Sequence, residues 1–244
     1  MLMTIYGRAF KVLMKKPLKL WGISLLSVAL AGVLGALCGF AIPGLALAVG
    51  LLVGTGMTMI YLRGYRGEEV SVQQIFACFK DWNTIMRVLC GLGWMCLWIF
   101  LWSLIPIVGP IFALIRTYEY RLTPYILVFE PEVPITEAIK KSSELTKGYK
   151  FQMWLADFVH VFFFIGAVIV LGLLSSIPVL GVLFALALFV VYIAYIALVP
   201  LFMGLVQSAF YEEIVGTNAK FCANCGQRLE NGSAFCPSCG QAVE

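Results

Sequence analysis

Four cysteines close to the C-terminus form the clearest chemical pattern in the chain. They occur as two C-x-x-C pairs, within Phe221–Gln227 and Phe235–Gln241, and a glycine follows each pair. Two thiolates spaced in this way can bind one metal ion, and four thiolates make the closed tetrahedral shell of structural zinc. The glycine permits a tight turn in which backbone N–H groups face the sulfur atoms. We therefore predict one structural Zn²⁺, held by Cys222, Cys225, Cys236 and Cys239.

A second group of polar residues interrupts segments that are otherwise apolar. It comprises Arg116, Glu119, Arg121, Asp157 and His160. Charge within a membrane is costly and often functional. At 1.5 Å per residue, Arg121, Asp157 and His160 all lie roughly 9–14 Å from the cytosolic membrane surface. One hypothesis is a polar pocket, open to the cytosol, whose arginines bind an anionic headgroup or solute. The other, which we favour, is a structural network in which Glu119 neutralises one arginine and Asp157 the other.

The segments that carry these residues are long and apolar. The 244 residues are 61% hydrophobic and 12% charged, with a mean hydropathy of +0.95. Soluble domains carry about 25% charged residues, so most of this surface must face lipid. Apolar segments of about 20 residues or more match the hydrocarbon core of a bilayer. They predict spanning helices over Leu20–Ala41, Gly44–Leu62, Ile85–Ile105, Ile107–Phe129, Trp154–Ile177 and Val179–Phe210, the last kinked at Pro200 or extended beyond the bilayer.

The distribution of positive charge predicts how these helices are oriented. Apart from Arg116 and Arg121, the lysines and arginines occur in residues 1–19, 63–87, 140–150 and 220–228. The connections at 42–44, 103–110 and 175–181 carry no charge. The positive-inside rule then places both termini in the cytosol, in a multi-pass protein of the plasma membrane. Cytosolic thiols are kept reduced, which favours zinc over the alternative of two disulfides among the C-terminal cysteines.

An internal repeat groups the predicted spans into hairpins. Ser103–Leu114 aligns with Ser175–Leu186, with seven of twelve positions identical, and Ile42-Pro43 marks a similar turn. An amphipathic stretch precedes each hairpin: Thr4–Lys16, Ser71–Trp82 and Ile135–Lys147. We interpret these as three parallel units, each an interfacial helix followed by a helical hairpin, although apolar sequences also align by chance. The amphipathic helices could lie on the membrane or pack under the bundle as connectors. The predicted fold is thus an all-α polytopic membrane domain over residues 1–216, followed by a small zinc-binding domain over 217–244.

Several short motifs carry a resemblance to a known family. They are Tyr118-x-Tyr120, Tyr125-Ile126-Leu127, Glu137-Ala138-Ile139, Lys147-Gly148-Tyr149-Lys150 and Ser208-Ala209-Phe210-Tyr211. With them, most of residues 1–215 resembles a bacterial integral-membrane family known as domain of unknown function 975. The chain departs from the family pattern at Glu130-Pro131-Glu132, where an Asp-Asn-Pro-like turn is usual, and at Thr146, where methionine is common. The resemblance implies a helical membrane fold and no established activity. The two cysteine pairs resemble the zinc-ribbon modules that end many bacterial proteins.

The sequence argues against two classes of function. It contains no Ser-His-Asp arrangement, phosphate loop, H-E-x-x-H motif or paired-carboxylate cleft, so we do not expect an enzyme. Residues 217–244 hold two basic and two acidic residues, without the positive excess expected of a nucleic-acid-binding domain.

Two functions remain. The first is a membrane protein that binds, senses or moves a lipid or small solute, as the repeats and intramembrane charges suggest. Against it, Pro200 is the only obvious helix break in the predicted spans. The alternative is a membrane scaffold that recruits cytosolic proteins through the zinc ribbon and the amphipathic helices.

Overall fold

The structure is a computed structural model that describes residues 2–15, 17–41, 43–178, 180–217, 220–221 and 228–229. These residues are helical almost throughout. The first half contains α1 (Leu2–Lys15), α2 (Pro17–Ala41), α3 (Pro43–Arg66), the 3-10 helix η1 (Val72–Phe79) and α4 (Trp82–Ser103). The second half contains α5 (Gly109–Glu119), α6 (Thr123–Phe129), α7 (Ile135–Leu145), α8 (Lys150–Leu174), α9 (Gly181–Thr217) and the strands β1 (Lys220–Phe221) and β2 (Arg228–Leu229).

Five helices of the described part are long and apolar enough to cross a membrane. Their candidate spans are Lys19–Ala36, Gly44–Arg66, Trp82–Ser103, Lys150–Leu174 and Gly181–Gly216. They lie where hydropathy places the first, second, third, fifth and sixth spans. The helical character and the membrane-compatible composition therefore agree with the sequence prediction.

The predicted fourth span is not a single helix. A continuous helix was expected over Ile107–Phe129, but α5 ends at Glu119 and α6 begins at Thr123. Pro124 lies in the first turn of α6, where its missing N–H is not needed. Deeper within a helix, the proline ring would clash with the carbonyl of Tyr120 and remove one hydrogen bond. The prediction of one unbroken helix is wrong. It followed the apolar run, which continues through Pro124, and did not allow for the effect of proline on the helix.

The last helix behaves differently around its own proline. α9 continues through Pro200 for 37 residues. At 1.5 Å per residue it is about 55 Å long, well beyond the roughly 30 Å of a hydrocarbon core. The expected extension beyond the bilayer therefore agrees with the length of α9.

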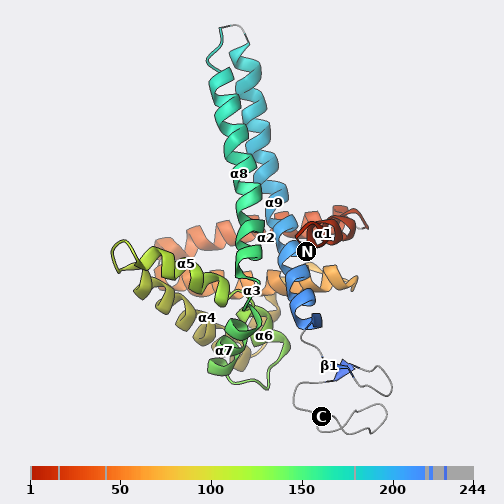
Figure 1. Ribbon diagram of the computed structural model, residues 1–244, viewed down its shortest axis with the longest axis vertical. Coiled ribbons are helices and arrows are strands. Elements are labelled where there is room, and N and C mark those ends of the chain that lie inside the picture. Colours follow the sequence, from red (N-terminus) through yellow and green to blue (C-terminus); the bar gives the residue numbers. More distant parts are fainter. Residues whose placement is uncertain are drawn as a thin grey trace.

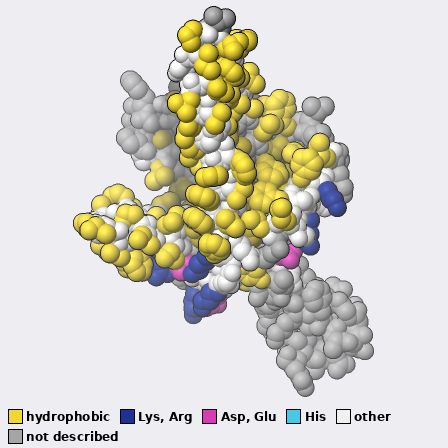
Figure 2. Space-filling model, turned by 45° about the horizontal axis from the view of Figure 1, so that its top comes forward, with side chains coloured by type: hydrophobic (Ala, Val, Ile, Leu, Met, Phe, Trp, Pro, Cys, Tyr) yellow, Lys and Arg dark blue, Asp and Glu magenta, His cyan; other side chains and the backbone are white. Residues whose placement is uncertain are grey.

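The long helices form hairpins that project from a common base. Figure 1 shows α8 and the first half of α9 projecting as a hairpin, while α4 and α5 point away in another direction. Near the tip of the long hairpin, Leu173 and Val182 are both 71% exposed. Hydrophobic side chains cover this hairpin, whereas the visible Lys, Arg, Asp and Glu side chains gather near the base (Figure 2). The exposed hairpin surface is thus apolar and suited to lipid.

The packed core lies at the base, where the ends of most helices meet. Ile5 of α1, Ile75 of η1, Val88 of α4 and Leu205 of α9 are almost completely buried within it. Two glycines allow close contacts with α3 in this region. A Cβ at Gly56 would lie 2.1 Å from the carbonyl oxygen of Ile75, and one at Gly204 would lie 2.2 Å from the ring of Tyr61. Small residues at these positions therefore let η1 and α9 pack directly on α3.

Helices also form at the three amphipathic stretches, as α1, η1 and α7. Each places part of one face in the core: Ile5 and Ala9 of α1, Ile75 and Cys78 of η1, and Ala138 and Ser142 of α7 are buried. α7 packs against α4, α5 and α6. This packing fits the connector interpretation for α7.

Candidate functional site

The break between α5 and α6 is held by a serine from α7. The backbone N–H of Leu122 donates to Ser142 Oγ at 3.2 Å, and Ser142 Oγ donates to the carbonyl of Glu119 at 2.8 Å. Thr146 Oγ1, one turn further along, lies 3.3 Å from the same carbonyl. Ser142 and Thr146 are both 0% exposed. Two backbone groups that the break deprives of helical partners are thus satisfied by side chains, as buried polar groups require.

An arginine in the break pairs with an aspartate on α8. Arg121 Nη1 lies 2.6 Å from Asp157 Oδ2, and Arg121 Nη2 donates to Asp157 Oδ1 at 3.0 Å. The hydroxyl of Tyr118 donates to Asp157 Oδ2 at 3.0 Å, and the guanidinium of Arg121 lies 5.2 Å from the centre of the Tyr118 ring. Two parallel contacts between guanidinium and carboxylate give a strong and directional pair. We call Tyr118, Arg121 and Asp157 the Arg121–Asp157 network.

A second charged group lies just before the break. Glu119 contacts Arg116 Nη1 and Lys150 Nζ, each at 2.5 Å. Lys150 begins α8, so this pair and the Arg121–Asp157 network both join the break to α8. Lys150 was not among the site residues predicted from the sequence, although it belongs to the Lys147-Gly148-Tyr149-Lys150 motif.

His160 lies apart from these pairs. Its Nδ1 is 3.3 Å from the carbonyl oxygen of Ala156, and its ring centre is 6.1 Å from that of Tyr195. The same Ala156 carbonyl accepts a 2.7 Å hydrogen bond from the Tyr6 hydroxyl of α1. Burial, and secondarily the charge of Asp157, raise the pKa of Tyr6. The five residues singled out in the sequence thus separate into two ion-paired groups and one histidine.

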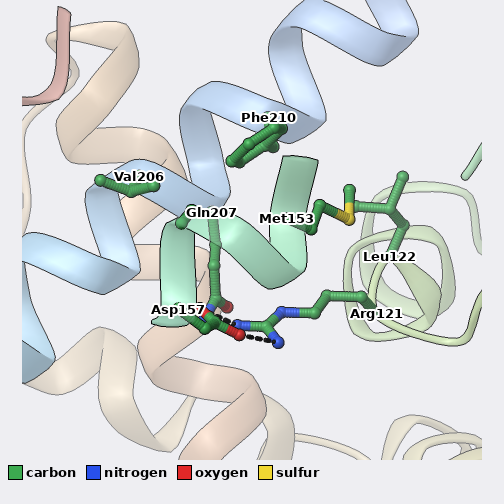
Figure 3. A pocket seen from close by; sticks show the side chains of 8 residues that line it. Arg121, Leu122, Met153, Asp157, Val206, Gln207 and Phe210 are labelled. Carbon is green, nitrogen blue, oxygen red and sulfur yellow. Dashed lines mark hydrogen bonds and ion pairs between the residues drawn. The ribbon is translucent and has the colours of Figure 1, made fainter. Parts of the chain in front are cut away.

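The Arg121–Asp157 network borders a small cavity between the break, α8 and α9. Figure 3 shows Gln207 of α9 reaching toward Asp157 and Arg121, with Met153 and Phe210 on the apolar side. The cavity volume is about 10 Å³, room for about one water molecule. A larger ligand would require the cavity to open.

Arg87 is a further residue that sequence reasoning missed. Its Nε donates to the carbonyl of Leu127 at 2.9 Å, and its Nη2 donates to the carbonyls of Glu130, at 3.0 Å, and Val133. The guanidinium thereby satisfies carbonyls at the end of α6 and in the following loop. In the sequence Arg87 appeared only as one of the positive charges near the membrane surface. Its partners lie 40 to 46 positions away, so no local pattern indicates this role.

The four predicted zinc ligands lie outside the described residues. The strands next to them pair antiparallel, with Lys220 opposite Leu229 and Phe221 opposite Arg228. Cys222 and Cys225 belong to the connection between these strands. Within the described ranges, no group of three His, Cys, Asp or Glu residues could hold a metal ion.

Comparisons with known proteins agree with the resemblance seen in the sequence. A family described as protein of unknown function (DUF975) matches residues 94–218, and a zinc-ribbon domain matches residues 215–243. No curated protein and no solved structure matches the chain. The first range contains the break, α8 and α9, and therefore the whole Arg121–Asp157 network. The second contains all four predicted zinc ligands.

Proposed function

The chain belongs to DUF975, a family of proteins of unknown function, and from this premise we propose that it is a multi-pass membrane protein that binds, senses or moves a lipid or a small solute. The observation that carries the proposal is the break between α5 and α6, because the charged residues cluster around it. Substrate sites of membrane transporters are typically built at discontinuous helices. The objection that only Pro200 interrupts a predicted span therefore no longer holds.

Within this proposal, the Arg121–Asp157 network is a closed site. Arg121 would bind an anionic headgroup or solute through its guanidinium group. Until a ligand binds, this guanidinium is paired with the carboxylate of Asp157. Gln207 adds an amide from α9 at the same point. In this proposal the site opens when Arg121 and Asp157 separate, and the Lys150–Glu119 contact joins the same two elements.

We further propose that α5 and α6 together cross the membrane as a sixth, discontinuous span. Residues 109–129 would extend over about 31 Å if they followed one axis. That length is close to the thickness of the hydrocarbon core. Six crossings place both termini on the side that carries the lysines and arginines, which we assign to the cytosol.

The turns of two hairpins support the proposed internal repeat. The N–H groups of Gly109 and Gly181 each donate to the carbonyl four residues earlier, at 3.0 and 2.8 Å. The hydroxyls of Ser103 and Ser175 each donate to the carbonyl three residues earlier, at 2.6 and 2.7 Å. Both pairs of residues are separated by the same 72 positions that align the two sequences. The α4–α5 and α8–α9 hairpins thus turn with the same hydrogen bonds.

Exposed apolar residues favour contact between α1 and the membrane surface. Met3, Phe10 and Met14 remain more than half exposed, although the opposite face of α1 is buried in the core. Their spacing of seven and four residues places them on one side of the helix. We propose that this stripe lies in the cytosolic leaflet of the membrane.

The ligand-binding proposal can be tested by analysing the lipids and solutes that co-purify with the protein. Mass spectrometry would compare the full chain with Arg121→Gln and Arg121→Lys, after each has shown an unchanged helical circular dichroism spectrum. A matched control is Arg8→Gln, because Arg8 is also paired with an acid, Glu213, but on the exposed surface. We expect Arg121→Gln to lose a ligand that Arg121→Lys and Arg8→Gln retain. Identical ligand contents in all four proteins would refute the proposal.

The zinc-ribbon match supports a second candidate, a scaffold that recruits a cytosolic protein. In this case a specific partner should cross-link to the full chain in cells. Cys222→Ser should abolish that cross-link, and Arg121→Gln should leave it intact. The opposite pattern would argue for the ligand-binding site and against the scaffold.

A further inference from the structure

A second and larger cavity lies at the charged end of α3 and α4. Its walls come from the end of α3, from η1, from the start of α4 and from the end of α6 and the loop after it. Its volume is about 520 Å³, within the range of small-molecule sites. It shares no lining residue with the cavity at the Arg121–Asp157 network.

The lining of this cavity is positively charged. Arg63, Lys80 and Arg87 all contribute to it, and none of its described lining residues is an Asp or Glu. Ser71 and Thr84 add hydroxyl groups. Three cationic side chains and two hydroxyl groups around one cavity can bind an anion that has several oxygen acceptors.

The three cations differ in how far they are already engaged. The three carbonyl contacts of Arg87 use its Nε and Nη2, which fixes the guanidinium at the cavity wall. Arg63 Nε lies 3.9 Å from Glu68 Oε2, and the Glu68 side chain is half exposed. Such exposed and distant pairs are weak. The Lys80 side chain has no hydrogen bond or ion pair within the described part of the chain. Two of the three cations are therefore available to a ligand.

Three of the acidic side chains near the cavity already have partners. Glu68 makes the long contact with Arg63, and Glu130 pairs with Lys141. Asp81 accepts the N–H of Thr84 at the start of α4. These carboxylates reduce the local positive charge without lining the cavity.

The depth of the cavity points to the class of ligand. The candidate span of α3 ends at Arg66, and that of α4 begins at Trp82. These two candidate span ends meet at the cavity, and phospholipid phosphates lie at the level where membrane spans end. Met59, Leu127 and Val128 add an apolar wall that suits the glycerol and upper acyl part of a lipid. We propose that this cavity binds a phosphate group, carried by an anionic phospholipid or by a free phosphate compound.

The proposal is tested with the full chain and two phosphate probes. Native mass spectrometry would measure binding of phosphatidylglycerol, with phosphatidylcholine of the same acyl chains as the reference lipid. Calorimetry would measure binding of inorganic phosphate. The test variant is Arg63→Gln with Lys80→Gln, and its charge-preserving counterpart is Arg63→Lys with Lys80→Arg. Lys140→Gln, an exposed change on α7 away from the cavity, controls for the loss of positive charge at this end of the protein.

We expect the double glutamine variant to bind phosphatidylglycerol or phosphate about tenfold more weakly, as the loss of two charged contacts implies. The charge-preserving variant and Lys140→Gln should stay within about twofold of the natural protein. Weakening of lipid binding alone identifies a headgroup site, and weakening of phosphate binding identifies a site for free phosphate compounds. The proposal is overturned if neither probe binds, or if the double glutamine variant and Lys140→Gln bind equally well.

Discussion

Replacing Ser142 with alanine removes the single hydroxyl that bridges the break between α5 and α6. In the structure this hydroxyl accepts the N–H of Leu122 and donates to the carbonyl of Glu119. The change deletes one oxygen atom and leaves the backbone of α7 intact. Its consequences therefore come mainly from the two backbone groups that lose a partner.

The structure gives the size of the expected effect. The N–H of Leu122 is buried, and an unsatisfied buried donor costs about 1–3 kcal/mol. The carbonyl of Glu119 keeps one donor, Thr146 Oγ1 at 3.3 Å. Losing its hydrogen bond from Ser142 therefore costs less, about 0.5 kcal/mol. Together these two losses lower the free energy of unfolding by about 2 kcal/mol. The equilibrium constant of unfolding then rises about thirtyfold.

Reversible unfolding by SDS in mixed micelles, followed by circular dichroism and tryptophan fluorescence, measures this difference. Ser143→Ala is the matched control: Ser143 is the next residue of α7 and only half buried, and its hydroxyl makes no hydrogen bond within the described ranges. We expect the control to stay within about 0.5 kcal/mol of the natural protein. If the two alanine variants unfold at the same SDS fraction, Ser142 does not support the break, and the reasoning is wrong.

Three further predictions concern Arg87, the Cys78 thiol and the C-terminal cysteines. Arg87→Lys should lower the free energy of unfolding by about 2 kcal/mol in the same titration, because one ammonium group cannot reach three carbonyls; an unchanged midpoint would contradict this. Burial raises the pKa of the Cys78 thiol to about 11, so iodoacetamide at pH 7.5 should leave Cys78 unmodified in the folded protein and modify it after denaturation in SDS. Modification of Cys78 before denaturation, detected by peptide mapping, would contradict the packing of η1 on α3. Cys236→Ala should abolish the binding of about one equivalent of zinc, measured by elemental mass spectrometry, whereas Cys96→Ala should retain it.

Much of the fold could be predicted because membrane helices are encoded by the length of apolar runs. The run from Leu20 to Ala41 lies within α2, and the run from Trp154 to Ile177 overlaps α8 closely. The same reasoning failed between Ile107 and Phe129, where it gave too little weight to Pro124. Hydropathy averages over a window and does not register one residue without an N–H.

The pairing of charges was only partly accessible from the sequence. The hypothesis that Asp157 neutralises one of the arginines agrees with the structure, in which Asp157 pairs with Arg121. The depth argument behind it assumed antiparallel helices, whereas α5 and α8 run in different directions (Figure 1) and Arg121 lies in the break after α5. Lys150 was missed because it begins α8, outside the predicted fifth span. The bridging role of Ser142 depends on how α7 lies across the break, and this contact spans 20 positions of sequence. Such roles are decided by tertiary packing and leave no periodic signal.

The contacts at the break also constrain how the α8–α9 hairpin can move. Glu119 binds Lys150 and Arg121 binds Asp157, so α8 is attached at two points that are about 10 Å apart along its axis. The break itself is fixed to α7 by Ser142, which leaves α8 little freedom to rotate at its base. Beyond these attachments, many apolar side chains of the hairpin are exposed, Phe163 and Leu173 among them. A ligand that displaced Asp157 from Arg121 would release one of the two attachments, so in the proposed mechanism ligand binding and the orientation of the hairpin are coupled.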